Sequence, residues 1–216
     1  MTLFRTAACT LLCLISLPSF ALSEQGQAQL QNLQDRWAEI NYQLPQEQRE
    51  KAFASLSEQA QKAVAAEPNS AELQIWNGII LSTYAGAKGG LGALGLVKEA
   101  KASLEQGLAL DPKALSGSAY TSLGSLYYQV PGWPVGFGDD EKAEAMLKQA
   151  LAINPDGIDP NYFYADYLTR AKRYAEAKVA LEKALQAPAR PNRLSADAGR
   201  KAEIQALLAK VNAELE

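Results

Sequence analysis

The sequence has no histidine among its 216 residues, and this absence removes several classes of function. Without an imidazole there is no Ser-His-Asp or Cys-His catalysis, no histidine-ligated metal and no histidine-based pH switch. An excess of positive charge is also missing, since 21 Lys and Arg face 24 Asp and Glu for a net charge of −3. A nucleic-acid binder presents a basic surface, so we expect no nucleic-acid partner. We also expect no metal and no cofactor.

Cysteine is nearly absent, and its two copies, Cys9 and Cys13, both lie within 1–21. That segment has Arg5 near its start, a short apolar stretch over 7–17 and small residues before its end, which is typical of a secretory signal peptide. The apolar stretch falls short of the roughly 20 residues that span a membrane. We therefore expect cleavage after 1–21, export to the bacterial periplasm and no stable membrane insertion. The mature chain then has no cysteine for disulfides or thiolate chemistry.

Alternation of apolar and polar residues, the mark of strands, is also missing, and a helical pattern recurs instead. Three segments share this pattern. In each, an Ala is followed four positions later by a Leu, and then by an Ala or Gly, a second Leu and a Pro. Spacings of three and four residues place side chains on one face of a helix, and Pro ends the helix. The segments are Ala100, Leu104, Gly107, Leu108 and Pro112; Ala143, Leu147, Ala150, Leu151 and Pro155; and Ala177, Leu181, Ala184, Leu185 and Pro188.

A second helix with its own apolar or aromatic stripe precedes each of these segments. The pattern therefore predicts a pair of helices that occurs three times, with small residues where the helices touch. The stripes are Ile75, Trp76, Gly78, Ile79 and Leu81; Tyr120, Leu123, Gly124, Tyr127 and Tyr128; and Tyr162, Tyr164, Ala165, Tyr167 and Leu168.

These pairs resemble the tetratricopeptide repeat over about 69–188. The best match runs from Asn161 to Pro188, and the first helix of another unit matches at Tyr120, Leu123-Gly124 and Tyr127. The resemblance implies an all-α, right-handed solenoid of antiparallel helix hairpins. The closing prolines lie 44, 43 and 33 residues apart, whereas the family period is about 34. We therefore expect three units over 69–188, the first two carrying inserted hairpin loops at 85–96 and 130–140.

Helices are also predicted on both sides of the repeats. The segment 22–68 should form an N-terminal hairpin from helices at 24–42 and 46–67. The segment 189–216 should form a linker and a C-terminal helix that caps the last exposed hydrophobic surface of the stack. Arg200 is expected on the solvated face of that helix.

The insertion at 85–96 contains Gly90, Gly92 and Gly95 in a GxGxxG arrangement. A dinucleotide site needs this motif after a β-strand, and the preceding segment here is helical. We therefore interpret it as a hairpin loop, with Leu91 and Leu94 tucked against the stack.

The insertion at 130–140 carries two aromatic side chains, Trp133 and Phe137, on a loop restricted by prolines. Two interpretations stay open. Both rings could fill the gap between neighbouring hairpins, with Asp139 or Asp140 capping the next helix. Alternatively, the loop could present an aromatic anchor to a partner.

In the family that the sequence resembles, the first helix of each hairpin lines a concave groove that holds a peptide or a partner helix. The resemblance therefore implies a protein-interaction scaffold without catalytic activity, binding a protein or peptide partner. Alternatives are an accessory subunit of an envelope transport system and a carboxylate-dependent enzyme acting on cell-wall material. The implied groove residues are Glu72, Ile75, Ile79, Thr121, Ser125, Tyr128, Gln129, Tyr162, Asp166, Thr169 and Arg170.

Overall fold

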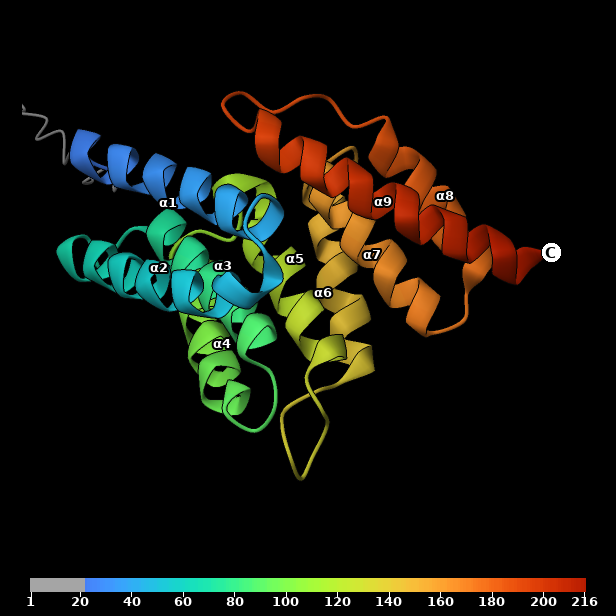
Figure 1. Ribbon diagram of the computed structural model, residues 1–216, viewed down its shortest axis with the longest axis horizontal. Coiled ribbons are helices and arrows are strands. Elements are labelled where there is room, and N and C mark those ends of the chain that lie inside the picture. Colours follow the sequence, from blue (N-terminus) through green and yellow to red (C-terminus); the bar gives the residue numbers. More distant parts are fainter. Residues whose placement is uncertain (1–21) are drawn as a thin grey trace, which may run out of the picture.

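The computed structural model describes residues 22–216, and over this range all of the regular structure is α-helical (Figure 1). This confirms the predicted all-α fold, while the predicted signal peptide, 1–21, lies outside the described residues. The helices within the described range are α1 Glu24–Tyr42, α2 Gln46–Ala66, α3 Ala71–Lys88, α4 Ala93–Leu110, α5 Ala114–Gln129, α6 Asp140–Ile153, α7 Ile158–Arg170, α8 Tyr174–Leu185 and α9 Leu194–Leu215.

Side-chain caps explain where several helices begin. The Ser23 and Ser70 hydroxyls accept hydrogen bonds from the backbone N–H of Gly26 and Leu73 at the starts of α1 and α3. Asp139 accepts from the N–H of Lys142 at 3.0 Å and so caps α6, as the sequence predicts. Each cap gives a hydrogen-bond partner to an N–H group that the helix itself cannot bond.

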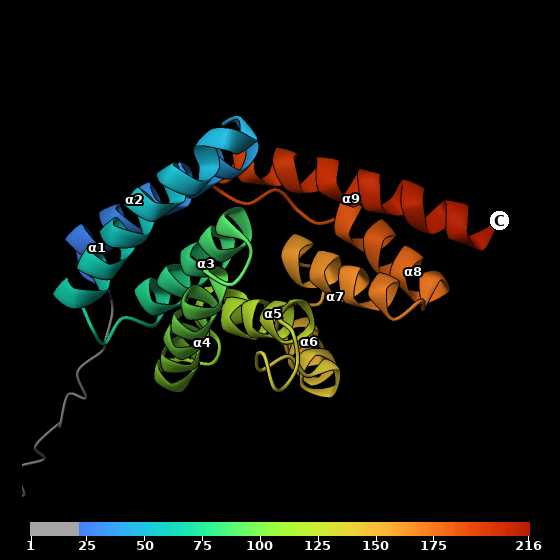
Figure 2. The same cartoon turned by 60° about the horizontal axis from the view of Figure 1, so that its bottom comes forward.

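The helices form a stack of hairpins, α3/α4, α5/α6 and α7/α8, with α1/α2 at one end and α9 at the other (Figures 1 and 2). One row consists of α1, α3, α5, α7 and α9, each of which packs on the next odd-numbered helix. The even-numbered helices cover the other side of this inner row. The structure thus confirms a solenoid of helix hairpins.

Small residues of the repeat lie where the two helices of a hairpin touch. A Cβ atom on Gly78 would lie 2.5 Å from Cγ of Leu104, and one on Gly124 would lie 2.7 Å from Cγ of Leu147. The two glycines therefore occupy equivalent positions in successive units. The second Leu of each segment is partly buried, whereas the Ala positions and the first Leu are fully buried, as the pattern predicts: Ala100, Leu104, Ala143, Leu147, Ala150, Ala177, Leu181 and Ala184.

The first insertion is mainly helix, which corrects the expected loop at 85–96. Because α3 runs to Lys88 and α4 starts at Ala93, only 89–92 connect them. Gly89 and Gly90, with φ of 64° and 60°, reverse the chain in a conformation that other residues resist. Leu91 lies at the tip of this tight reversal with 83% of its surface exposed, so the expectation that it packs on the stack is wrong.

The second insertion divides its two aromatic rings between different environments. Phe137 packs edge-to-face on Tyr127, with the ring centroids 5.8 Å apart. Trp133 is 90% exposed at the far part of the loop, so the expectation that it fills a gap is wrong. The loop is fastened at its base, where the N–H of Asp139 donates to the carbonyl of Tyr127 at 2.8 Å, and this holds Phe137 but not Trp133 against α5.

Candidate functional site

A cavity of about 940 Å³ lies on the inner side of the stack. Its walls come from all five helices of the inner row, α1, α3, α5, α7 and α9, together with the end of α2 near Arg49 and the segment 188–193 before α9. The lining also includes Asn154, Asp156 and Gly157 before α7, and it extends outside the three repeat units.

Helix α9 reaches back to the N-terminal hairpin (Figure 2) and contributes Ala196, Arg200 and Glu203 to the lining of the cavity. The Tyr42 ring of α1 packs against Gly199, where an added Cβ would lie 2.3 Å from Cγ of the ring. The amide of Gln43 donates to the Ser195 hydroxyl at 3.0 Å, and the Tyr42 hydroxyl donates to Glu203 at 3.3 Å. These contacts join the first and last helices of the stack along one seam.

One side of the cavity carries a charged cluster, defined here as the Asp159 cluster: Asp159, Arg190, Asp197, Arg200 and Glu203. Asp159 in the first turn of α7 accepts from Arg190 at 2.6 Å and from Arg200 at 2.8 Å. Arg190 also pairs with Asp197, and Arg200 pairs with Glu203. Burial would raise the pKa of Asp159, but the two guanidinium groups outweigh it and lower this pKa to about 2. The carboxylate therefore stays ionised at neutral pH.

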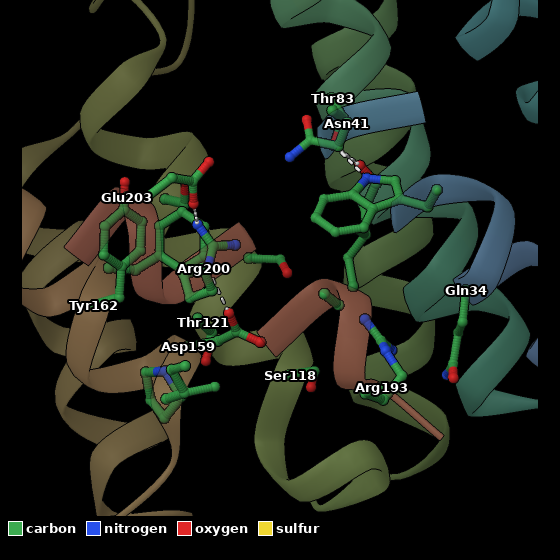
Figure 3. A pocket seen from close by; sticks show the side chains of 18 of the residues that line it. Gln34, Asn41, Thr83, Ser118, Thr121, Asp159, Tyr162, Arg193, Arg200 and Glu203 are labelled. Carbon is green, nitrogen blue, oxygen red and sulfur yellow. Dashed lines mark hydrogen bonds and ion pairs between the residues drawn. The ribbon is translucent and has the colours of Figure 1, made fainter. Parts of the chain in front are cut away.

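Arg200 is 8% exposed and lies in this cluster, so the expected solvated position is wrong (Figure 3). Its guanidinium carbon lies 4.4 Å from the ring centroid of Tyr162 and 4.8 Å from that of Phe163. The reason is that the first half of α9 packs over α7, where Asp159 and these rings provide a partner for a buried cation. Among the described residues no three His, Cys, Asp or Glu side chains converge on a metal position.

The side of the cavity toward the N-terminal hairpin is aromatic. The indole N–H of Trp37 donates to the Thr83 hydroxyl at 2.9 Å, and the Trp37 ring meets Trp76 edge-on with centroids 6.0 Å apart. The guanidinium carbon of Arg193 lies 4.8 Å from the centroid of Trp76. Burial and the neighbouring Arg190 lower the pKa of Arg193, which still leaves this group charged at neutral pH.

Between these two sides, α5 contributes a stripe of neutral polar side chains at helical spacing. Serine, threonine and glutamine can both donate and accept hydrogen bonds, which suits the backbone of an extended ligand. The amide of Gln129 already donates to Ser125 at 2.9 Å. The stripe consists of Ser118, Thr121, Ser122, Ser125 and Gln129.

Six of the eleven residues predicted for the groove line the cavity. They come from α3, α5 and α7, the first helices of the three hairpins. They are Ile79, Thr121, Ser125, Gln129, Tyr162 and Asp166.

The other five predicted residues lie elsewhere, and packing explains four of them. Ile75 is fully buried, because its side chain fills the space beside Gly107. The buried Thr169 hydroxyl donates to the carbonyl of Ala165 within α7. The buried Tyr128 donates its hydroxyl to Asp166 at 2.8 Å, and Arg170 packs over the same ring at 5.1 Å on the exposed side. Glu72 lies beside Ser70 at the start of α3, outside the cavity lining.

The sequence analysis missed four aromatic or cationic residues of the cavity lining: Trp37, Arg190, Arg193 and Arg200. They belong to α1, the segment before α9 and α9 itself, where no repeat pattern assigns a direction. For the three arginines, the signal in the sequence was their occurrence within eleven residues, around Asp197.

Comparison with known proteins yields no matching family model and no matching curated protein. Solved structures similar to this chain include MamA (21% identity over 78% of this chain and 92% of that one, TM-score 0.44). Another is TTC0263, a thermophilic TPR protein of Thermus thermophilus, with 17% identity over 85% of this chain and 99% of that one and a TM-score of 0.45. A third is PilF of Pseudomonas aeruginosa, with 15% identity over 89% of this chain and 90% of that one and a TM-score of 0.36. The assignment of the fold rests on the helix hairpins described above.

Proposed function

We propose that this protein is a binding module that holds a short extended segment of a protein or peptide partner in the cavity. The supporting observation is the cavity itself, at about 940 Å³ within the range of ligand sites. Aromatic rings on one side offer contact area, and the hydroxyl and amide stripe of α5 offers bonds to a peptide backbone.

The charges of the lining favour binding over hydrolysis by carboxylates. A glycoside hydrolase needs one carboxylic acid that is still protonated near neutral pH, with a raised pKa. Asp159, deep in the charged cluster, has its pKa lowered to about 2. Glu203 is paired with Arg200, and Asp166 accepts from Tyr128. These carboxylates are thus engaged with donors.

We propose further that the protein works in the periplasm after removal of 1–21. The proposal rests on Arg5, the apolar stretch and the small residues at the end of that segment. Among residues 22–216, no helix combines the length and apolar character needed to cross a bilayer. Mass spectrometry of the protein from a periplasmic extract should give a chain that starts at Leu22, and a chain that starts at Met1 would contradict the proposal.

Site-specific photo-cross-linking in cells tests the binding site. A benzoylphenylalanine at Ser122, in the cavity wall, should give a discrete covalent adduct with the partner. The matched control is the same group at Val179, which is exposed on α8 outside the cavity and should give none. Adducts from position 133 but not 122 would assign binding to the loop at 130–140 instead. A transporter's solute-binding protein in the adduct would identify an accessory transport subunit.

A further inference from the structure

Arg193 is half-buried and, unlike Arg190 and Arg200, has no carboxylate partner among the described residues. Arg190 and Arg200 each pair with Asp159 and with a second acid. Arg193 makes no such pair and lies over the face of Trp76. Arg49, the fourth arginine of the lining, donates its Nε to the carbonyl of Leu44 at 2.9 Å.

A guanidinium group that is partly removed from water without a counter-charge is costly. The lowered pKa of Arg193 reflects this position, because burial and Arg190 both oppose its charge. In Figure 3, Arg193 lies on the opposite side of the cavity from Asp159 and Arg200. Asp159, Asp197 and Asp35 favour its charge from a distance, but none of them pairs with it directly, so an anion bound there would meet a guanidinium group without an ion-pair partner among residues 22–216.

Arg193 has an apolar neighbourhood on the side of Trp76. Trp76 belongs to the same buried cluster as Trp37, and Ile79 and Leu115 pack against this cluster while lining the cavity. A ligand anchored at Arg193 would place its adjoining atoms on these side chains, where burying apolar surface is favourable.

We propose that the cavity takes a ligand bearing a carboxylate next to an apolar group, with the carboxylate paired to Arg193 and the apolar group on Trp76, Ile79 and Leu115. The proposal rests on the proposed function and specifies its ligand. A planar guanidinium suits the two oxygens of a carboxylate. The carboxylate could belong to the C-terminus of a peptide or to a free organic acid.

Calorimetry with acid and amide pairs tests this chemistry and separates its two sources. One pair is 3-phenylpropanoate and 3-phenylpropanamide, and the other is N-acetyl-Ala-Ala-Phe with a free or an amidated C-terminus. The acid should bind about tenfold more tightly than its amide in at least one pair, since a charge-assisted bond replaces a neutral one. Preference confined to the peptide pair identifies a C-terminus, and preference confined to the small pair identifies an organic acid.

Variants of Arg193 assign the effect to this residue. Arg193→Gln should abolish the preference for the acid, and Arg193→Lys, which retains the charge, should restore part of it. Arg170→Gln is the matched control, because Arg170 also packs over an aromatic ring but pairs with Asp166 and lies outside the cavity lining. It should leave the preference unchanged. Helix content measured by circular dichroism verifies that each variant is folded.

Three results would overturn the proposal. Equal affinity for acid and amide would show that the cavity does not recognise the carboxylate, and it would leave the proposal of peptide binding untouched. The absence of binding by either acid up to about 10 mM would have the same consequence. An acid preference that survives Arg193→Gln would also refute it. The proposed function fails separately, if position 122 gives no cross-linked partner.

Discussion

At the scale of single residues, Asp159 is the carboxylate on which the buried charges of the cavity depend. Among residues 22–216 only Asp159 bridges Arg190 of the linker and Arg200 of α9. Arg200 is buried and Arg190 is half-buried. A buried ion pair adds little net stability compared with apolar packing, but removal of one partner leaves the other charge uncompensated. The contribution of Asp159 to the free energy of unfolding therefore becomes measurable when its carboxylate is removed.

Replacing Asp159 by Asn should lower the free energy of unfolding by about 3 kcal/mol at pH 7, because Arg190 and Arg200 lose a shared partner. The control is Asp156→Asn on the same wall. Asp156 has a 76% exposed side chain and pairs with Lys183 at 3.2 Å, so the cost should stay below about 0.5 kcal/mol. Urea unfolding of the three proteins measures both values, and equal stabilities of the two variants would contradict the role of Asp159.

The pH dependence of the same variants gives an independent check. The pKa of Asp159 falls from 3.8 to about 2 on folding, so its contribution is present above pH 4 and is lost as the pH falls toward 2. A shift of this size corresponds to about 2.5 kcal/mol. The difference in stability between wild type and Asp159→Asn should therefore shrink over this range, whereas that for Asp156→Asn should stay small throughout.

At the scale of helices, close approach within a hairpin depends on the small residues of the repeat. Gly124→Ala would place a Cβ 2.7 Å from Cγ of Leu147 and 3.3 Å from the backbone oxygen of Ala143. The overpacked contact should cost about 1–3 kcal/mol. Gly95→Ala is the control, because this helical glycine of α4 has nothing within 4 Å of the new atom and alanine should stabilise by roughly 0.5–1 kcal/mol. In thermal melts, Gly124→Ala should lower the melting temperature and Gly95→Ala should raise it. A lower melting temperature for Gly95→Ala would contradict the assignment of the small residues to the hairpin contact.

The helices could be predicted from the sequence because their information is local. Spacings of three and four residues among Ala143, Leu147 and Ala150 fix one buried face without knowledge of any other element. The cavity could be predicted only in the part lined by the repeat helices. Arg200 donates to Asp159, 41 positions earlier in the chain. The sequence near Arg200 shows only a polar residue on a terminal helix, so it does not reveal this partner. The tight reversal at Gly89 and Gly90 was hidden because a run of glycines fits both a loop and a short helix connection.

At the scale of the whole molecule, α9 makes this stack different from a linear array of repeats. In such an array each unit contacts only its neighbours. Here α9 packs on α7 and α8 and also on α1, so contacts link the first helix to the last. Unfolding of one end must therefore break contacts at the other, and we expect a single cooperative transition instead of fraying from the N-terminal hairpin.

A disulfide across the seam between α1 and α9 tests this linkage. A Cβ on Gly199 would lie 2.3 Å from Cγ of Tyr42, and the Cβ of Tyr42 is bonded to that atom. The two Cβ atoms are therefore close enough to be bridged, at the short end of the roughly 3.5–4.5 Å that a disulfide prefers, and a small outward shift of the helices brings them into this range. Residues 22–216 contain no other cysteine, because Cys9 and Cys13 both lie within 1–21, so the test uses a chain that starts at Leu22.

In the double variant Tyr42→Cys and Gly199→Cys, oxidation should therefore link the two helices and close a loop that covers most of the chain. By the entropy of loop closure, the oxidised form should exceed the reduced form of the same variant by about 4–5 kcal/mol. Thermal melts with and without reductant, with each single variant as a control, measure the difference. If α1 and α9 separated freely in solution, the disulfide would form slowly and the oxidised protein would still melt in two steps. If α1 and α9 stay in contact in solution, the disulfide should form rapidly, and the oxidised protein should unfold in one sharper transition at a higher temperature.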